Sequence, residues 1–199
     1  MKLFIFSALF LILSLVVMCI VSLRRRIAQT LKRAQQGAPQ SQYEAALLYY
    51  RGKYGVKKDW IRTFDYLYSA AQTGHIKALN NLGALYCAGH GTKKNLDKAL
   101  VCYRQAAEQG DFEGMINLAV LYHLQKDDTQ AFAWMKKAAD GGSPLGQRML
   151  AEFYYAGIGT EPDKQTGLRY YMLAAKQGEP NAIAFLKTRD PRLQHHGPM

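Results

Sequence analysis

The sequence predicts an all-α protein: four helix-turn-helix repeats that stack into a solenoid, a short capping helix after them, and one transmembrane helix before them. Paired alanines followed by a glycine recur four times, and the glycines (Gly74, Gly110, Gly142 and Gly178) are 36, 32 and 36 residues apart. A period in this range is typical of stacked repeats, and apolar residues within each repeat follow helical spacing. An uncharged run extends from Leu3 to Leu23, which is long enough for a membrane span.

The second repeat, Lys77–Phe112, shows how one unit is built. The segment Ala88–Gly91 ends a first helix, because glycine adopts left-handed backbone at little steric cost, and Asn95 or Asp97 is expected to cap a second helix. Gly83 is expected to let a neighbouring helix approach closely. Each helix carries an apolar stripe: Ala78, Leu82, Leu85 and Tyr86 on the first, and Ala99, Tyr103, Ala106 and Ala107 on the second. Such a hairpin cannot bury its stripe alone, so it is expected to stack on its neighbours.

This pattern resembles the Sel-one-like repeat (SLR) family, a branch of the tetratricopeptide-type helical solenoids. In that family a helix containing leucine, glycine and tyrosine leads to a G-x-G loop, an Asx, and a second helix with paired alanines and a glycine. The resemblance implies a right-handed α-solenoid over residues 41–188. Its parts are expected at about 43–76, 77–112, 113–144 and 145–180, with a cap at 181–188 and a disordered tail at 189–199.

Two units depart from the family pattern. In the first unit, Lys53 stands where the first loop glycine is expected, and Gly55 is the second. The third unit, 113–144, is four residues shorter than its neighbours, and its loop "HLQKDD" has no G-x-G. We therefore expect that loop to resemble the shorter loop of tetratricopeptide repeats.

Residues 1–23 are predicted to be an uncleaved, single-pass membrane anchor. A helix over Leu3–Leu23 is roughly 30 Å long, which is the thickness of a bilayer core, and the following "VSLRRR" is a poor signal-peptidase site. The basic flank favours cytoplasmic repeats by the positive-inside rule, with periplasmic or lumenal repeats as the alternative. The flank residues expected at the membrane surface are Arg24, Arg25, Arg26, Lys32 and Arg33.

Residues 24–40 are expected to form a basic juxtamembrane segment and linker. The first 40 residues carry six Lys or Arg and no Asp or Glu, a net charge of +6, whereas the rest of the chain carries +5. This asymmetry favours an anionic membrane surface over nucleic acid as the partner of the segment. Ile27, Leu31 and Ala34 form a thin apolar stripe that lies either at the lipid headgroups or on a solvated helical stalk.

The sequence offers no residues for catalysis, so we expect no enzymatic activity, no metal and no cofactor. The five histidines form no metal-binding pattern, and His195 and His196 lie in the expected tail. The segment Gly89–Lys94, "GHGTKK", lacks the spacing of a phosphate-binding loop and does not follow a strand. Cys87 and Cys102 are expected to be two buried thiols, with a single disulfide within the repeat as the alternative.

Because the first helices of SLR-type solenoids line the concave side, the resemblance implies that a partner protein or peptide binds there. In the similar tetratricopeptide grooves, asparagine amides hold the backbone of a bound peptide; the alternative is that these asparagines bond neighbouring helices. Arginines on this face either attract an acidic peptide or belong to a solvated surface. The candidate partner-binding residues are Lys77, Asn80, Asn81, Asn117, His123, Arg148 and Arg51.

The sequence therefore favours a membrane-anchored scaffold or adaptor that binds another protein through the concave face of its solenoid. The first alternative is an envelope-structural or lipid-surface protein with periplasmic repeats. The second is a membrane-bound hydrolase, for which the sequence shows no nucleophile or metal cluster. Neither nucleic acid nor a small-molecule substrate is expected as a partner.

Overall fold

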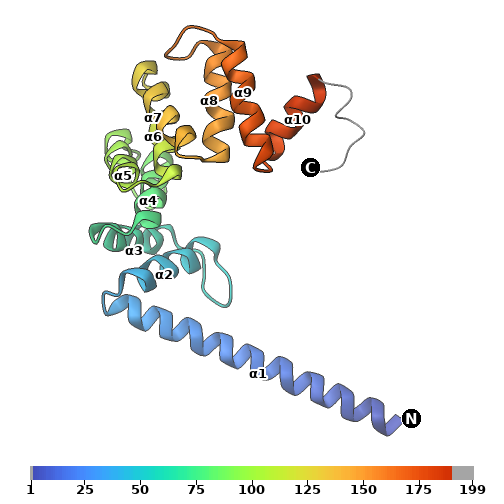
Figure 1. Ribbon diagram of the computed structural model, residues 1–199. Helices are drawn as coiled ribbons and strands as arrows, with labels where there is room; N and C mark the ends of the chain where they lie inside the picture. The colour runs from blue at the N-terminus through green and yellow to red at the C-terminus, as the bar shows by residue number, and fades with distance from the viewer. Residues whose placement is uncertain (1, 190–199) are drawn as a thin grey trace. The chain divides into compact units, whose positions relative to one another are not determined.

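A computed structural model of the protein describes the backbone of residues 2–189 and the side chains of residues 12–189. Within this part of the chain the protein consists of ten α-helices and contains no strand, so the prediction of an all-α fold is confirmed (Figure 1). The first helix is α1 (Lys2–Gln35) and the last is α10 (Pro180–Arg189). Apart from Arg189, the predicted tail and its two histidines lie outside the described residues.

Between α1 and α10, eight helices of 13 residues each alternate as the first (A) and second (B) helices of four hairpins. The A helices are α2 (Pro39–Arg51), α4 (Ile76–Ala88), α6 (Phe112–Leu124) and α8 (Pro144–Ala156). The B helices are α3 (Trp60–Gln72), α5 (Leu96–Glu108), α7 (Asp128–Asp140) and α9 (Lys164–Lys176). The helices form two compact units, α1–α4 and α5–α10.

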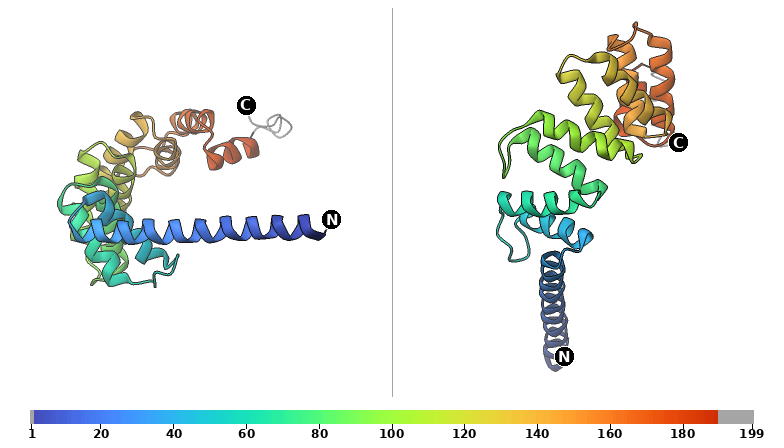
Figure 2. Two further views of the ribbon diagram at one scale, coloured as in Figure 1. Left: turned by 90° about the horizontal axis from the view of Figure 1, so that it is seen from below. Right: turned by 90° about the vertical axis from the view of Figure 1, so that its left-hand side faces the viewer.

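In the first unit, each helix packs mainly on the next one in the chain: α1 on α2, α2 on α3, and α3 on α4 (Figure 2). The core consists of small and medium-sized apolar side chains, because alanines let helix backbones approach closely while leucines fill the space between them. The buried residues of this core include Ala45, Ala46, Leu67, Ala70, Ala78, Leu79 and Leu82.

In the second unit, two buried clusters follow each other along the chain. The first joins α6, α7 and α8 through Ile116, Ala119, Ala131, Met135, Leu150 and Phe153. The second joins α8, α9 and α10 through Ala151, Tyr171, Ala174 and Ala182. The ring of Phe185 on α10 stacks on Tyr171 with 3.8 Å between centroids. The helix α10 therefore covers the apolar face of the last hairpin, as a capping helix does.

The paired alanines that mark the repeats pack against a small residue of the next A helix. A Cβ added to Gly114 would lie 2.8 Å from Cβ of Ala106, and one added to Gly146 would lie 3.0 Å from Cβ of Ala138. Side chains larger than hydrogen at these two positions would push the helices apart, so the glycines set the spacing between one hairpin and the next.

The end of α2 corrects the expected position of the first loop glycine. Gly52 directly follows the helix and adopts left-handed backbone with φ of 60°. Gly89 after α4 and Gly157 after α8 occupy the same position with φ of 73° and 71°. The glycine is therefore present one residue before Lys53, and the prediction that Lys53 replaces it is wrong.

The short loop of the third hairpin closes without glycine. Lys126 adopts the left-handed conformation with φ of 67°. Its amide donates to the carbonyl of His123 at 3.0 Å, and the amide of Asp127 donates to that of Tyr122 at 3.0 Å. This pair of hydrogen bonds satisfies carbonyls at the end of α6, and the Asp127 carboxylate then caps α7 by accepting from the amide of Gln130.

The predicted membrane anchor is wrong. Among the residues that the structure describes, no helix combines the length and the apolar character that a bilayer crossing requires. The first helix, α1, extends from Lys2 to Gln35. The helix continues without a break through Arg24, Arg25 and Arg26. The predicted single-pass localisation is therefore not supported, and neither is the assignment of the repeats to one side of a membrane.

The apolar stripe at the end of α1 belongs to the first unit. Ala34 is 2% exposed, Ile27 and Leu31 are half-buried, and α1 packs on α2. Part of the stripe is therefore covered by α2. It places the basic end of α1 beside the first A helix.

Candidate functional site

Because the A helices have equal lengths, a residue of one A helix corresponds to the residue at the same position of the next A helix. Asn81 is the sixth residue of α4 and Asn117 is the sixth residue of α6, and both side chains are half-buried. Lys77 and Ala84 are exposed and share one face of α4 with Asn81, since they are four and three residues away from it. We use the term A-helix surface for this face of α4 in the first unit and, separately, for the corresponding face of α6 around Asn117 in the second unit.

Two other predicted residues are engaged within the fold. Asn80 is 3% exposed, so its side chain is not accessible to a partner. His123 lies at the end of α6, where its Nδ1 atom is 2.6 Å from Oδ1 of Asp128 and its ring lies 5.9 Å from that of Phe153. The imidazole therefore joins the end of α6 to the start of α7 and contacts α8.

Arg148 on α8 is held between two carboxylates. Its guanidinium forms an ion pair with Glu152, one turn along the same helix, and its Nε atom lies 3.3 Å from Oε1 of Glu179. The second oxygen of Glu179 accepts from the amide of Ala182 in the first turn of α10. Arg148, which the sequence predicted to attract an acidic peptide, is thus already paired within the chain. Its interaction with Glu179 connects α8 to the start of α10.

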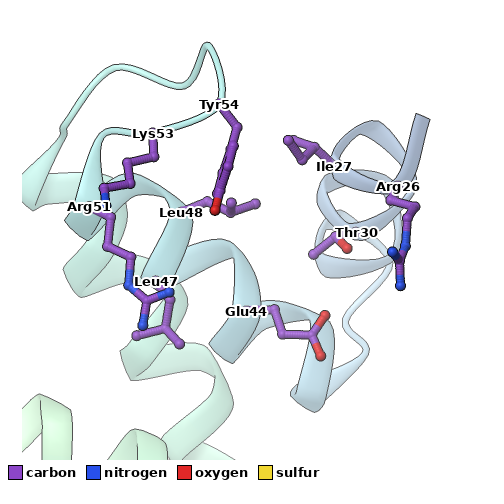
Figure 3. Close-up of a pocket in the computed structure, with 9 residues that line it drawn as sticks. All are labelled: Arg26, Ile27, Thr30, Glu44, Leu47, Leu48, Arg51, Lys53 and Tyr54. Carbon is purple, nitrogen blue, oxygen red and sulfur yellow. The ribbon is translucent and has the colours of Figure 1, made fainter. Parts of the chain in front are cut away.

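The structure brings together Arg26 and Arg51, for which the sequence predicted separate roles. Both line a cleft of about 220 Å³ between the end of α1, the end of α2 and the loop that follows α2 (Figure 3). Tyr54 extends from that loop into the space between Ile27 of α1 and Leu48 of α2. The other lining residues are Thr30, Glu44, Leu47 and Lys53.

The cleft combines an apolar floor with cations that form no ion pair with a carboxylate among residues 12–189. None of the ion pairs formed within the described part of the chain uses Arg26, Arg51 or Lys53. The single carboxylate of the cleft, Glu44, accepts a hydrogen bond from the side chain of Gln40 at 2.9 Å. An exposed guanidinium beside apolar side chains is well suited to bind a carboxylate on an apolar ligand.

Sequence reasoning missed most of this cleft. Ile27 was visible as part of an apolar stripe, but nothing in the pattern indicates that the stripe packs beside α2. Tyr54 gave no signal, because its position depends on a left-handed backbone with φ of 60°. The remaining predicted basic residues, Arg24, Arg25, Lys32 and Arg33, are exposed on α1 and do not line the cleft.

Two further histidines make contacts within the fold, and two of the three cysteines are at least half-buried. His75 caps α4 by accepting from the amide of Ala78, and the ring of His90 stacks on Trp60 with 4.1 Å between centroids. Cys87 is half-buried and Cys102 is buried. No group of three or more His, Cys, Asp or Glu in residues 12–189 is arranged to hold a metal ion.

Proteins with related sequence and structure support this description of the fold. The chain is 29% identical over 179 residues to the chitin synthase regulator SKT5 of Saccharomyces cerevisiae, covering 86% of this chain and 26% of the relative. A protective antigen present in uropathogenic Escherichia coli strains, which displays an SLR fold, matches with a TM-score of 0.74 and 28% identity over 81% of this chain and 35% of that chain. A Sel1 repeat protein from Oxalobacter formigenes matches with a TM-score of 0.70 and 29% identity over 76% of this chain and 63% of that chain. The chain thus spans about a quarter of the length of the curated yeast relative.

The Sel1 repeat family model matches four consecutive stretches of the chain, namely residues 39–75, 76–111, 113–143 and 144–179. Each stretch covers one A helix and the B helix that follows it, except that the third stretch omits Phe112, the first residue of α6. Together the stretches account for well over half of the sequence, and two solved structures at 28% and 29% identity have the same hairpin architecture. The chain therefore belongs to the Sel1 repeat family and has the SLR solenoid fold.

Proposed function

We propose that the protein is a scaffold or adaptor that binds another protein through the A helices of its solenoid. The observation that carries this proposal is the placement of half-buried amides, Asn81 and Asn117, at the same step of two successive A helices. A side-chain amide both donates and accepts hydrogen bonds, so it matches both polar groups of a peptide backbone. The yeast relative is named a regulator of chitin synthase, and a regulatory role is consistent with binding.

The structure narrows the set of side chains that we assign to partner binding. Lys77, Asn81, Asn117 and Arg51 reach the surface. Asn80 is buried, and His123 and Arg148 are engaged by carboxylates of the same chain. We therefore assign binding to the first four residues.

The test is a double substitution, Asn81→Ala with Asn117→Ala, in the full chain. Each lost hydrogen bond contributes about 0.5–1.5 kcal/mol net, so affinity for the partner should fall roughly three- to a hundredfold. The matched control removes two exposed amides of the B helices, Gln72→Ala with Gln105→Ala.

Tagged wild-type protein and both variants are used to capture partners from cell extract, at folded fractions matched by circular dichroism. We expect the asparagine variant alone to lose partners. Retention of the same partners at the same affinity by both variants would contradict the assignment of binding to the A-helix surface.

A further inference from the structure

The positive charge of the protein lies in the part of the chain that forms the first unit. Residues 1–94 contain 14 Lys or Arg and 3 Asp or Glu, a net charge of +11. Residues 95–199 contain 12 Lys or Arg and 12 Asp or Glu, a net charge of zero. Because the summed field of a surface steers association, an acidic partner is drawn to the first unit rather than to the second.

Within the first unit, the cleft between α1 and α2 offers these charges in a defined arrangement. Arg26 stands on α1, Arg51 at the end of α2, and Lys53 in the following loop, so three separate segments supply one cation each (Figure 3). With Glu44 included, the lining carries a formal charge of +2, from three cations and one carboxylate. The cations are therefore available for the acidic groups of a ligand.

The floor of the cleft is apolar and small. Ile27, Leu47 and Leu48 are half-buried, and Tyr54 is 57% exposed. The volume of about 220 Å³ is below the roughly 300–1,000 Å³ of sites that enclose a whole small molecule. It suits one or two apolar side chains of a segment whose remaining parts stay outside the cleft.

We propose that this cleft is a docking site for an acidic peptide segment of a partner protein, with an apolar side chain of that segment on Ile27, Leu47, Leu48 and Tyr54. The flanking carboxylates of the segment pair with Arg26, Arg51 and Lys53. This inference rests on the proposed scaffold function and names the chemistry of the partner. A peptide fits better than nucleic acid, because three of the four apolar side chains in the cleft, Ile27, Leu47 and Leu48, are aliphatic and give a base no ring on which to stack.

The probe is a fluorescein-labelled peptide with two leucines among glutamates, titrated with the full chain and followed by fluorescence anisotropy. We expect saturable binding that weakens when the glutamates are replaced by glutamines or the leucines by serines. Raising the ionic strength should weaken binding as well, because screening shortens the reach of exposed charges to about 10 Å at 0.1 M. Labelled single-stranded DNA serves as the competing probe.

The decisive variant is Arg26→Glu with Arg51→Glu, and its control is Arg24→Glu with Lys93→Glu. Both change the charge of the first unit equally, but the control residues are exposed outside the cleft. The cleft variant should lose at least about fourfold in affinity, since each exposed pair is both broken and replaced by repulsion. The control should lose less than about twofold.

A second variant, Tyr54→Gly, removes the ring at a position where the left-handed backbone suits glycine. This variant should keep the helical circular dichroism of the wild type. Its affinity for the leucine peptide should fall more than its affinity for the serine peptide. Equal losses in the cleft and control variants, tighter binding of the DNA, or no saturable binding of the acidic peptide would each overturn the inference.

The two proposals fail separately. If the asparagine variant loses its captured partners while the charge-reversed cleft variant keeps its affinity for the peptide, the docking inference fails and the scaffold function stands. If neither variant changes partner capture and the peptide does not bind, the scaffold function itself fails.

Discussion

Replacing Glu179 by alanine should destabilise the second unit, because it removes two interactions at the start of α10. The carboxylate lies 3.3 Å from Nε of Arg148, and the two side chains are 8% and 16% exposed. It also accepts from the amide of Ala182. Losing the cap costs about 0.5–2 kcal/mol. Breaking a fully buried ion pair costs about 3–5 kcal/mol, which we reduce to about 1–2 kcal/mol because Arg148 keeps Glu152 as a partner and retains some exposure.

The expected loss is therefore about 1.5–4 kcal/mol in the free energy of unfolding, measured by urea denaturation of the full chain and followed by far-ultraviolet circular dichroism. The matched control is Glu152→Ala. It removes the other carboxylate on Arg148, but its side chain is 48% exposed, so the loss should stay below about 1 kcal/mol. Equal transition midpoints for the two variants, or a larger loss for Glu152→Ala, would refute the reasoning that the buried carboxylate holds α10 in place.

Two further predictions concern the repeat architecture. Gly83→Leu should lower the melting temperature more than Ala84→Leu, because Gly83 is buried and Ala84 is exposed, and overpacking costs about 1–3 kcal/mol; equal melting temperatures would mean that the assigned helix faces are wrong. Lys126→Gly should raise the midpoint of urea unfolding, since Lys126 has φ of 67° and an L-residue in that conformation costs about 1–2 kcal/mol. The control Gln125→Gly, at φ of −83°, should lower the midpoint, and a loss of stability in both variants would contradict the strain argument.

The hairpins of this fold were predictable because their signals are local. Ala106, Ala107 and Gly110 lie within five residues of one another, and both alanines are buried. Asn95 was named as a possible cap and does accept from the amide of Lys98. Helical spacing and capping depend on residues within one or two turns of each other. The same local signals therefore occur again in each repeat, which makes the hairpins recognisable.

The features that were not predicted depend on contacts between distant parts of the chain. Arg148 and Glu179 are 31 residues apart in the sequence, so no local pattern indicates that the arginine is already paired. The placement of Ile27 beside α2 likewise depends on tertiary packing, and it creates the cleft that contains Arg51. The anchor was predicted from the length of the uncharged run Leu3–Leu23 and from the poor signal-peptidase site after it, and neither feature reports how the helix packs in the fold.

Site-specific photo-crosslinking tests most directly whether the A helices form the binding surface. A photoreactive phenylalanine analogue is placed at Ala84 on the A helix α4, or at Asp65 on the B helix α3; both positions are exposed and belong to the same unit. The account predicts a partner adduct from position 84, reduced in the background of Asn81→Ala with Asn117→Ala, and none from position 65. An adduct of equal yield from position 65, or one from position 84 that the asparagine substitutions leave unchanged, would contradict it.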